Sequence, residues 1–473
     1  MNYSIPENFI LGAAASAWQT EGWSGKQAGQ DSYLDAWYEA EPFVWHQGYG
    51  PAVATDFMNQ YKTDVRLMAE IGLTHYRTSI NWSRFFTDYE NLVVDEAYAQ
   101  HISDVINELL EAGVEPMFCL EHYELPKALM DRYDGWSSKH VIDLFVEYAR
   151  IVFERYGDRV KHWFTFNEPI VVQTRVYLDA IRWPHEQNSK KWMLWNYHKV
   201  LATARVVEVY KAGGYAGRIG CILNPEMVYP RSSSKEDQAA AHYYDLLYNR
   251  VFFDPLVLGQ YPEELLALCR ENDIWFEPTS EELALIRENT VDFLGVNQYY
   301  PKRVKAQRFA WAEGQPFHPT KYYEEFDLPG KQMNNSRGWE IYPSIMYDMA
   351  MYLTENYPDL DWFVAENGMG QMDEQRFTDE TGVIQDTYRI EFIREHLRYL
   401  LKAVEAGARC EGYMLWAFTD CVSPMNAFKN RYGLVSIDLE NQRARSKKAS
   451  ANWYATLIRE RQLQVADLSD EPK

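Results

Sequence analysis

One unit recurs along the whole chain and limits the folds that it can adopt. An amphipathic helical pattern ends near a glycine, and a short apolar run rich in β-forming residues follows. Residues 57–68 show helical spacing, Gly72 follows them, and the run 74–79 comes next. A glycine just past a helix is the usual left-handed cap, and alternating helices and strands predict a parallel sheet.

Five strand candidates follow this rule, behind Gly72, Gly113, Gly157, Gly217 and Gly407, and three further apolar runs bring the number of candidates to eight. They cover residues 9–14, 74–79, 114–120, 163–168, 219–224, 292–297, 362–366 and 412–416. Eight alternating units predict an α/β fold, a single (β/α)8 barrel over residues 1–473. A doubly wound sheet would place a glycine-rich turn early, whereas the glycines at 213–217 lie mid-chain and before a strand. The stretches near 24–55, 180–195 and 300–340 lack a regular pattern, and we expect them to be long βα loops that wall a pocket.

The composition and net charge limit the kinds of molecule that the protein is expected to bind. The 473 residues are 47% hydrophobic and 15% aromatic, which is enough for a large core. The net charge of −22 repels phosphate backbones and anionic membranes, so neither nucleic acid nor a membrane is expected as a partner. A small anionic substrate stays compatible with local cations, and the sequence leaves a homo-oligomer open.

The cysteines and the N-terminus add further expectations. Five cysteines lie far apart, without the spacing of a zinc site, and no clustered histidines occur, so no metal and no cofactor are expected. Cys119 and Cys221 lie in apolar runs and are predicted to be buried free thiols. The N-terminus has neither a basic segment nor a long apolar stretch, which predicts a soluble protein of the cytoplasm.

Two glutamates, Glu168 and Glu366, have the same local setting. Each ends an apolar run and has an asparagine beside it. A strand buried on both faces should not end on a charge unless that charge has a function or a close partner. Two such strands predict a carboxylate pair at one rim of the barrel, and paired carboxylates are what glycoside hydrolysis needs.

Other polar side chains lie near the carboxyl ends of the predicted strands, where barrel enzymes have their active sites. In chain order they are Gln19, Glu21, Arg77, His122, Asn167, Asn297, Tyr299 and Trp416. They suit a sugar site, with hydroxyl-binding groups around two carboxylates and a tryptophan to stack on a sugar ring. Simpler roles stay open: core packing for His122 and Trp416, and bonding to buried backbone for Gln19 and Asn297.

Several motifs resemble those of one enzyme family nearly from end to end. They are FILG (9–12), QTEG (19–22), YRTSINWSR (76–84), EHYELP (121–126), TFNEP (165–169), DFLGVN (292–297) and ENG (366–368). Together they resemble glycoside hydrolase family 1. The resemblance implies a retaining β-glycosidase, with Glu168 as acid/base and Glu366 as nucleophile. Arg77 and Tyr299 would then stabilise the Glu366 anion, and Asn167 would bond the sugar 2-hydroxyl.

The stretch after the eighth strand bears on the choice of sugar. Ordinary β-glucosidases of this family have a glutamate where Ser423 stands, whereas the phospho-glycosidase branch has serine followed by a lysine and a tyrosine that hold a 6-phosphate. A carboxylate would repel a phosphate, while a hydroxyl and an ammonium group bind it. Tyr432 matches the tyrosine, but Asn430 stands where the lysine is expected and Lys429 is its neighbour.

This departure leaves alternatives. A one-residue shift brings Lys429 to the phosphate, or Asn430 binds it weakly, or the ligand carries no phosphate. Pro424 favours a gluco-configured sugar, because phospho-galactosidases have a tryptophan there. The first hypothesis is a 6-phospho-β-glucosidase acting on a phosphorylated disaccharide or aryl β-glucoside. The others are a β-glucosidase or β-galactosidase for plain sugars, and a silent sugar-binding barrel, which the presence of both Glu168 and Glu366 disfavours.

Overall fold

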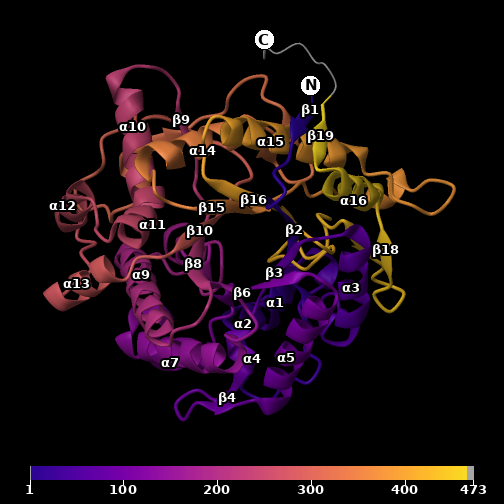
Figure 1. Ribbon diagram of the computed structural model, residues 1–473. Coiled ribbons are helices and arrows are strands. Elements are labelled where there is room, and N and C mark those ends of the chain that lie inside the picture. The colour runs from indigo at the N-terminus through magenta and orange to yellow at the C-terminus, as the bar shows by residue number, and fades with distance from the viewer. Residues whose placement is uncertain (1, 466–473) are drawn as a thin grey trace.

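The centre of the molecule is a closed barrel of eight parallel strands (Figure 1). The computed structural model describes residues 2–465. The barrel strands are β2 (Ile10–Ala14), β3 (His75–Ser79), β6 (Glu115–Glu121), β7 (His162–Asn167), β8 (Arg218–Leu223), β10 (Phe293–Asn297), β15 (Trp362–Asn367) and β16 (Cys410–Trp416). They follow chain order around the barrel, which closes where Gly412 of β16 pairs with Ile10 of β2. The (β/α)8 prediction is confirmed.

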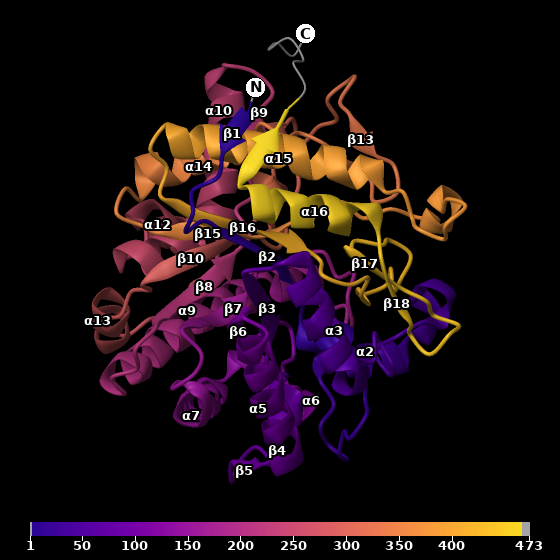
Figure 2. The same cartoon turned by 45° about the vertical axis from the view of Figure 1, so that its right-hand side comes forward.

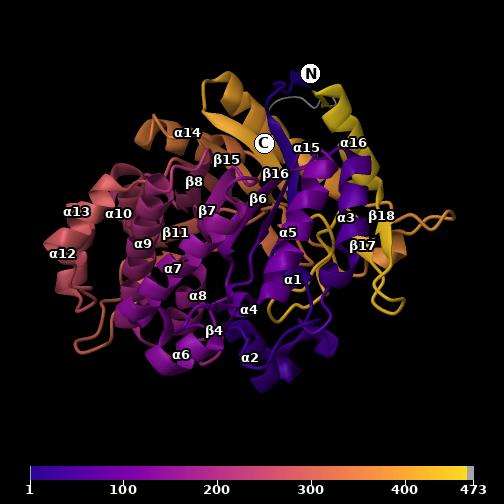
Figure 3. The same cartoon turned by 60° about the horizontal axis from the view of Figure 1, so that its bottom comes forward.

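Helices surround the strands, as Figures 2 and 3 show from two further directions. The long ones are α3 (Phe57–Ile71), α5 (Glu96–Glu111), α7 (Lys139–Tyr156), α9 (Ser189–Ala212), α14 (Ile345–Asn356), α15 (Thr387–Glu405) and α16 (Ala449–Glu460). Gly72 after α3 and Gly113 after α5 have positive φ, as a left-handed cap requires. Gly157 after α7 does not, since its φ is −66°. The cap prediction is therefore wrong at that helix.

The barrel interior is packed with side chains below the carboxyl ends of the strands. The residues that fill it are Ile10, Met117, Cys119, Phe164, Ile222, Phe293, Phe363, Ala365 and Met414. Close packing of this kind makes the barrel a core and not a pore, so a ligand can enter only at a rim. Cys119 and Cys221 are buried and free, which confirms that prediction.

The three stretches expected to be irregular contain regular elements. Residues 24–55 include α2 (Tyr33–Ala40), whose start is fixed by a capping box between Ser32 and Asp35. Helix α9 begins at Ser189, where the Asn188 side chain accepts a hydrogen bond from the Lys191 backbone. The third stretch holds β11 (Lys302–Ala306), β12 (Tyr323–Glu325), β13 (Met333–Asn334) and β14 (Trp339–Glu340). Strand β11 pairs with the distant β9 (Val228–Pro230), a contact that local sequence patterns do not reveal.

The segment after β16, residues 420–433, is here called the β16 loop. One carboxylate ties its two ends together, because Asp420 Oδ1 accepts hydrogen bonds from Gly433 N at 2.9 Å and from Lys448 Nζ at 2.8 Å. Lys448 is fully buried and also pairs with Glu374. Burial alone would raise the pKa of Asp420, but Lys448 and Arg431 lower it and the net shift is downward.

The two ends of the described chain lie side by side. Strand β1 (Asn2–Ser4) pairs antiparallel with β19 (Gln462–Gln464), as Figure 2 shows near the top of the view. Within residues 2–465, none of the helices has both the length and the apolar character needed to cross a bilayer.

Candidate active site

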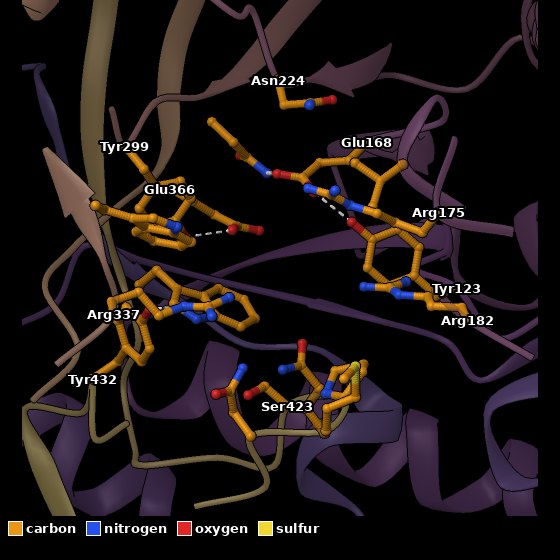
Figure 4. Close-up of a pocket in the computed structure, with 18 of the residues that line it drawn as sticks. Tyr123, Glu168, Arg175, Arg182, Asn224, Tyr299, Arg337, Glu366, Ser423 and Tyr432 are labelled. Atoms are coloured by element: carbon orange, nitrogen blue, oxygen red, sulfur yellow. Dashed lines mark hydrogen bonds between the residues drawn. The ribbon is translucent and has the colours of Figure 1, made fainter. Parts of the chain in front are cut away.

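A cavity of about 790 Å³ opens at the carboxyl ends of the strands (Figure 4). Most of the residues singled out in the sequence line it: Gln19, His122, Asn167, Glu168, Asn297, Tyr299, Glu366, Trp416, Ser423, Lys429 and Tyr432. Arg77 lies just beneath, fully buried, on β3. Glu21 and Asn430 do not line the cavity. Glu21 instead accepts a hydrogen bond from Tyr98 at 2.8 Å and pairs with Arg84 at 3.5 Å.

Glu366, near the end of β15, is held by two donors. Arg77 Nη2 donates to Glu366 Oε1, and the Tyr299 hydroxyl donates to Oε2 at 2.7 Å. Burial raises the pKa of Glu366 to about 7; the Arg77 charge opposes this, and the nearby Glu168 charge adds to it. Arg77 and Tyr299 favour the anion, as expected, but desolvation outweighs them and the net shift of the Glu366 pKa is upward.

Glu168 is the first residue after β7 and has a left-handed backbone with φ of 47°. Asn297 Nδ2 donates to Glu168 Oε1 at 3.0 Å, and the Tyr123 hydroxyl donates to Oε2. Figure 4 shows Glu168 and Glu366 on opposite sides of the cavity, facing each other across it. The two carboxylates thus come from different strands and are oriented by separate sets of donors.

A polar floor connects the two carboxylates. Arg77 Nη1 lies 3.3 Å from His122 Nδ1 and donates to Asn167 Oδ1 at 3.3 Å, while Asn297 Nδ2 donates to the same oxygen at 3.1 Å. Burial, and then the Arg77 charge, lowers the pKa of His122 well below its usual value, so the imidazole is neutral. The Trp416 ring lies 5.9 Å from the His122 ring and leaves a flat apolar surface toward the cavity.

Two amides in the floor differ in how far protein groups satisfy them. Gln19 Nε2 donates to the backbone oxygen of Val422 at 2.6 Å, and its Oε1 accepts from Ser16 Oγ at 2.9 Å. Gln19 therefore bonds to the backbone of the β16 loop, and it also lines the cavity. Asn297 Oδ1, in contrast, has no hydrogen-bond partner within residues 2–465 and is available to a ligand.

The residues predicted for a phosphate are only partly brought together. Ser423, Lys429 and Tyr432 line the cavity. Asn430 is buried to one side, where its Nδ2 donates to Asn426 Oδ1 at 3.3 Å. The sequence reasoning missed other residues that line the cavity, among them Tyr123, Arg175, Arg182, Arg337 and Trp339. The EHYELP motif contains Tyr123, and the stretches 180–195 and 300–340, expected to wall a pocket, contain Arg182, Arg337 and Trp339, but neither signal singled out these side chains.

Comparison with known proteins decides the family. The family model described as glycosyl hydrolase family 1 matches residues 1–463. The chain belongs to glycosyl hydrolase family 1. The resemblance seen in its motifs is confirmed, and its activity class is that of an O-glycosyl hydrolase.

Relatives within the family differ in their named substrates. The chain is 41% identical to the 6-phospho-beta-glucosidase GmuD of Bacillus subtilis (strain 168), over 96% of this chain and 97% of that protein. It is 31% identical to the aryl-phospho-beta-D-glucosidase BglC of the same organism, over 96% and 97% of the two chains. A solved family 1 b-glucosidase from Thermotoga maritima superposes with a TM-score of 0.87 at 27% identity, covering 98% of this chain and 99% of that one.

Proposed function

We propose that this family 1 enzyme is a retaining 6-phospho-β-glucosidase, with Glu366 as nucleophile and Glu168 as acid/base. In the first step a Glu366 oxygen bonds to the anomeric carbon while the bond to the aglycone oxygen breaks, and Glu168 gives its proton to that oxygen. In the second step Glu168 takes a proton from water, the water oxygen bonds to the anomeric carbon, and the bond to Glu366 breaks. Two displacements leave the anomeric configuration unchanged.

The contacts of the two glutamates support this division of roles. Arg77 and Tyr299 both donate to Glu366, and donors of this kind favour the charged carboxylate that attacks. The charge of Glu168 is one of the causes that raise the pKa of Glu366, so the two carboxylates influence each other across the cavity. Glu168 lines the same cavity, held by Asn297 and Tyr123, so its carboxyl is accessible to a ligand there.

The charge of the cavity wall is the observation that supports a phosphorylated substrate. The whole chain has a net charge of −22, yet four arginine and lysine side chains line the cavity, where three carboxylates also lie, and only one of these cations, Arg175, has a carboxylate partner within residues 2–465. Two of those carboxylates are Glu168 and Glu366 themselves. Where plain β-glucosidases of the family are expected to have a glutamate, Ser423 presents a neutral hydroxyl. A phosphate on the sugar 6-position would therefore meet donors and no opposing charge there.

A paired assay tests the proposal. The same chromogenic aryl β-glucoside is supplied with and without a 6-phosphate, together with the 6-phosphorylated galactoside. We expect kcat/KM to be at least roughly tenfold higher with the phosphate, because one charge-assisted bond is worth about 1.5–3 kcal/mol and 1.4 kcal/mol is about a factor of ten. Glu366→Gln serves as the control, since it should abolish turnover of every substrate while leaving the fold intact.

The outcomes separate the alternatives. A wild-type enzyme that prefers the plain glucoside would instead be an ordinary β-glucosidase. Faster turnover of the phosphorylated galactoside would overturn the gluco preference that Pro424 suggests. Binding without any turnover would indicate a silent sugar-binding barrel.

A further inference from the structure

We propose that Arg337 is the principal phosphate-binding cation of this enzyme and replaces the lysine that the β16 loop lacks. The inference rests on the proposed function, because it concerns the 6-phosphate of the same substrate. The lysine of the phospho-glycosidase branch has no counterpart at its expected position in this chain. Asn430 stands where the lysine is expected, carries no charge, and is buried outside the lining of the cavity, where it donates to Asn426.

Arg337 comes from a different part of the chain but reaches the same place. It lies in the turn between β13 (Met333–Asn334) and β14 (Trp339–Glu340) and lines the cavity. Its Nε donates to the Tyr432 hydroxyl at 3.2 Å. Tyr432 is the tyrosine of the predicted phosphate set, and Figure 4 shows Arg337 beside it, on the same side of the cavity as Glu366.

Most N–H donors of the Arg337 guanidinium have no partner within residues 2–465. Nε is the only side-chain nitrogen of Arg337 with a hydrogen bond inside residues 2–465, and the side chain forms no ion pair there. Both Nη groups therefore keep their N–H donors for a ligand. Arg175 in the same cavity differs, because Asp179 neutralises it at 2.6 Å. An unpaired guanidinium beside a buried hydroxyl suits a phosphate, which it can bind with two parallel bonds.

The protein fixes the position of Arg337 through its hairpin. The buried Asn334 accepts from the Arg337 backbone nitrogen at 3.3 Å and donates to Gly370 O at 3.0 Å. Glu340 holds the other strand of the hairpin through two bonds to Arg303, at 2.6 and 2.9 Å. The guanidinium itself lies 4.3 Å from the centre of the Trp339 ring. Little freedom is left to lose when a ligand binds.

Lys429 is less well placed for the principal role. It lines the cavity but is exposed, and no carboxylate or hydroxyl of residues 2–465 orients its ammonium group. Ordering a long, free side chain offsets part of what its charge contributes. We assign Lys429 an auxiliary role at the outer side of the phosphate, with Ser423 and Tyr432 supplying hydroxyl groups.

The test compares Arg337→Met, Arg337→Lys and Lys429→Met with the wild type on the paired phosphorylated and plain glucosides. Arg337→Met should lower kcat/KM for the phosphorylated substrate by roughly ten- to a hundredfold, mainly through KM, because the phosphate is bound equally in ground and transition states. Turnover of the plain glucoside should change by less than about threefold. Arg337→Lys should recover part of the loss, and Lys429→Met should lose less than Arg337→Met.

Two further measurements exclude a merely structural effect. Inhibition by glucose 6-phosphate should weaken in Arg337→Met by the same factor as kcat/KM, whereas inhibition by glucose should not change. Arg182→Met is the matched control, since this cation lines the cavity beside Tyr123, away from Tyr432. It should leave the ratio between the two substrates as in the wild type.

The failures can be told apart. If the wild type prefers the phosphorylated glucoside and Arg337→Met keeps that preference, the assignment of Arg337 is overturned and the proposed function stands. If Lys429→Met removes the preference instead, the principal cation is Lys429. If the wild type shows no preference for the phosphate, the proposed function fails and the role of Arg337 fails with it.

Discussion

Replacing Tyr299 with phenylalanine should move the acid side of the pH profile without changing the shape of the site. The Tyr299 hydroxyl donates to Glu366 Oε2 at 2.7 Å, a bond that favours the charged carboxylate. A hydrogen bond to a charged group is worth about 1.5–3 kcal/mol, and about 1.4 kcal/mol corresponds to one pKa unit. Removing it should raise the pKa of Glu366 from about 7 by roughly one to two further units.

The sign of the effect follows from the role of the nucleophile. Glu366 attacks only when ionised, so kcat/KM of the wild type should fall as the pH drops below about 7. In Tyr299→Phe the fall should begin at about pH 8–9, which lowers kcat/KM at pH 7 by roughly five- to fiftyfold. The loss should shrink as the pH rises, because the carboxylate ionises again.

The assay is a pH profile of kcat/KM with an aryl substrate whose leaving group needs little help from an acid. Such a substrate keeps proton donation by Glu168 from limiting the rate. Tyr300→Phe is the matched control: Tyr300 also lines the cavity and packs on Trp339, but its hydroxyl bonds to neither glutamate. Its acid limb should stay at about pH 7. Coincident limbs for Tyr299→Phe and the wild type would refute the link between this bond and the ionisation of Glu366.

Three further predictions concern other parts of the molecule. Glu168→Ala should lose hydrolysis of poor leaving groups most, and azide should restore turnover as a β-glycosyl azide; an α-azide would mean inversion. Lys448→Met should lower the free energy of unfolding by about 1.5–3 kcal/mol in a denaturant titration, because it removes the charge-assisted bonds to the buried Asp420 and Glu374, which keep only their weaker or shared pairs with Arg431 and Arg389. Burial lowers the pKa of His75 to about 3 and of His162 to about 4. Because these folded-state values lie below that of the unfolded chain, about 6.5, stability is complete above that pH and falls by about 1.4 kcal/mol per histidine per pH unit below it. His75→Gln should therefore make unfolding measurably less pH-dependent between pH 4 and 6, and an unchanged slope would contradict this account.

The barrel and the carboxylate pair could be predicted because their signals are local. Each predicted strand lies within two residues of an observed one, since a strand buried on both faces reads as a continuous apolar run. Glu168 and Glu366 stood out for the same reason, as charges at the ends of such runs. Their opposition across the cavity followed from the fold, because parallel strands all end at one rim.

The outer parts of the site could not be predicted in this way. Arg337 and Trp339 lie in a hairpin whose strands are two residues each, too short to leave a periodic pattern. Tyr123 was visible in its motif, but its bond to Glu168 depends on where two separate strand ends meet. Position along the β16 loop was equally ambiguous, since nothing in the sequence shows that Asn430 turns toward Asn426 and Lys429 toward the cavity.

The residues that hold the ends of the β16 loop differ from the residues of the loop that line the cavity. Asp420, Gly433 and Lys448 hold the two ends, and none of them lines the cavity, whereas Ser423, Pro424 and Lys429 do. The loop is thus fixed to the barrel at its two ends, while the residues between them that line the cavity can vary without loss of those bonds. An exchange of residues 422–430 for the loop of a plain β-glucosidase would alter the charge next to the bound sugar. The bonds of Asp420 with Gly433 and Lys448 would stay in place. The substrate preference of such an enzyme can therefore change through a few substitutions in this loop, without changes in the barrel.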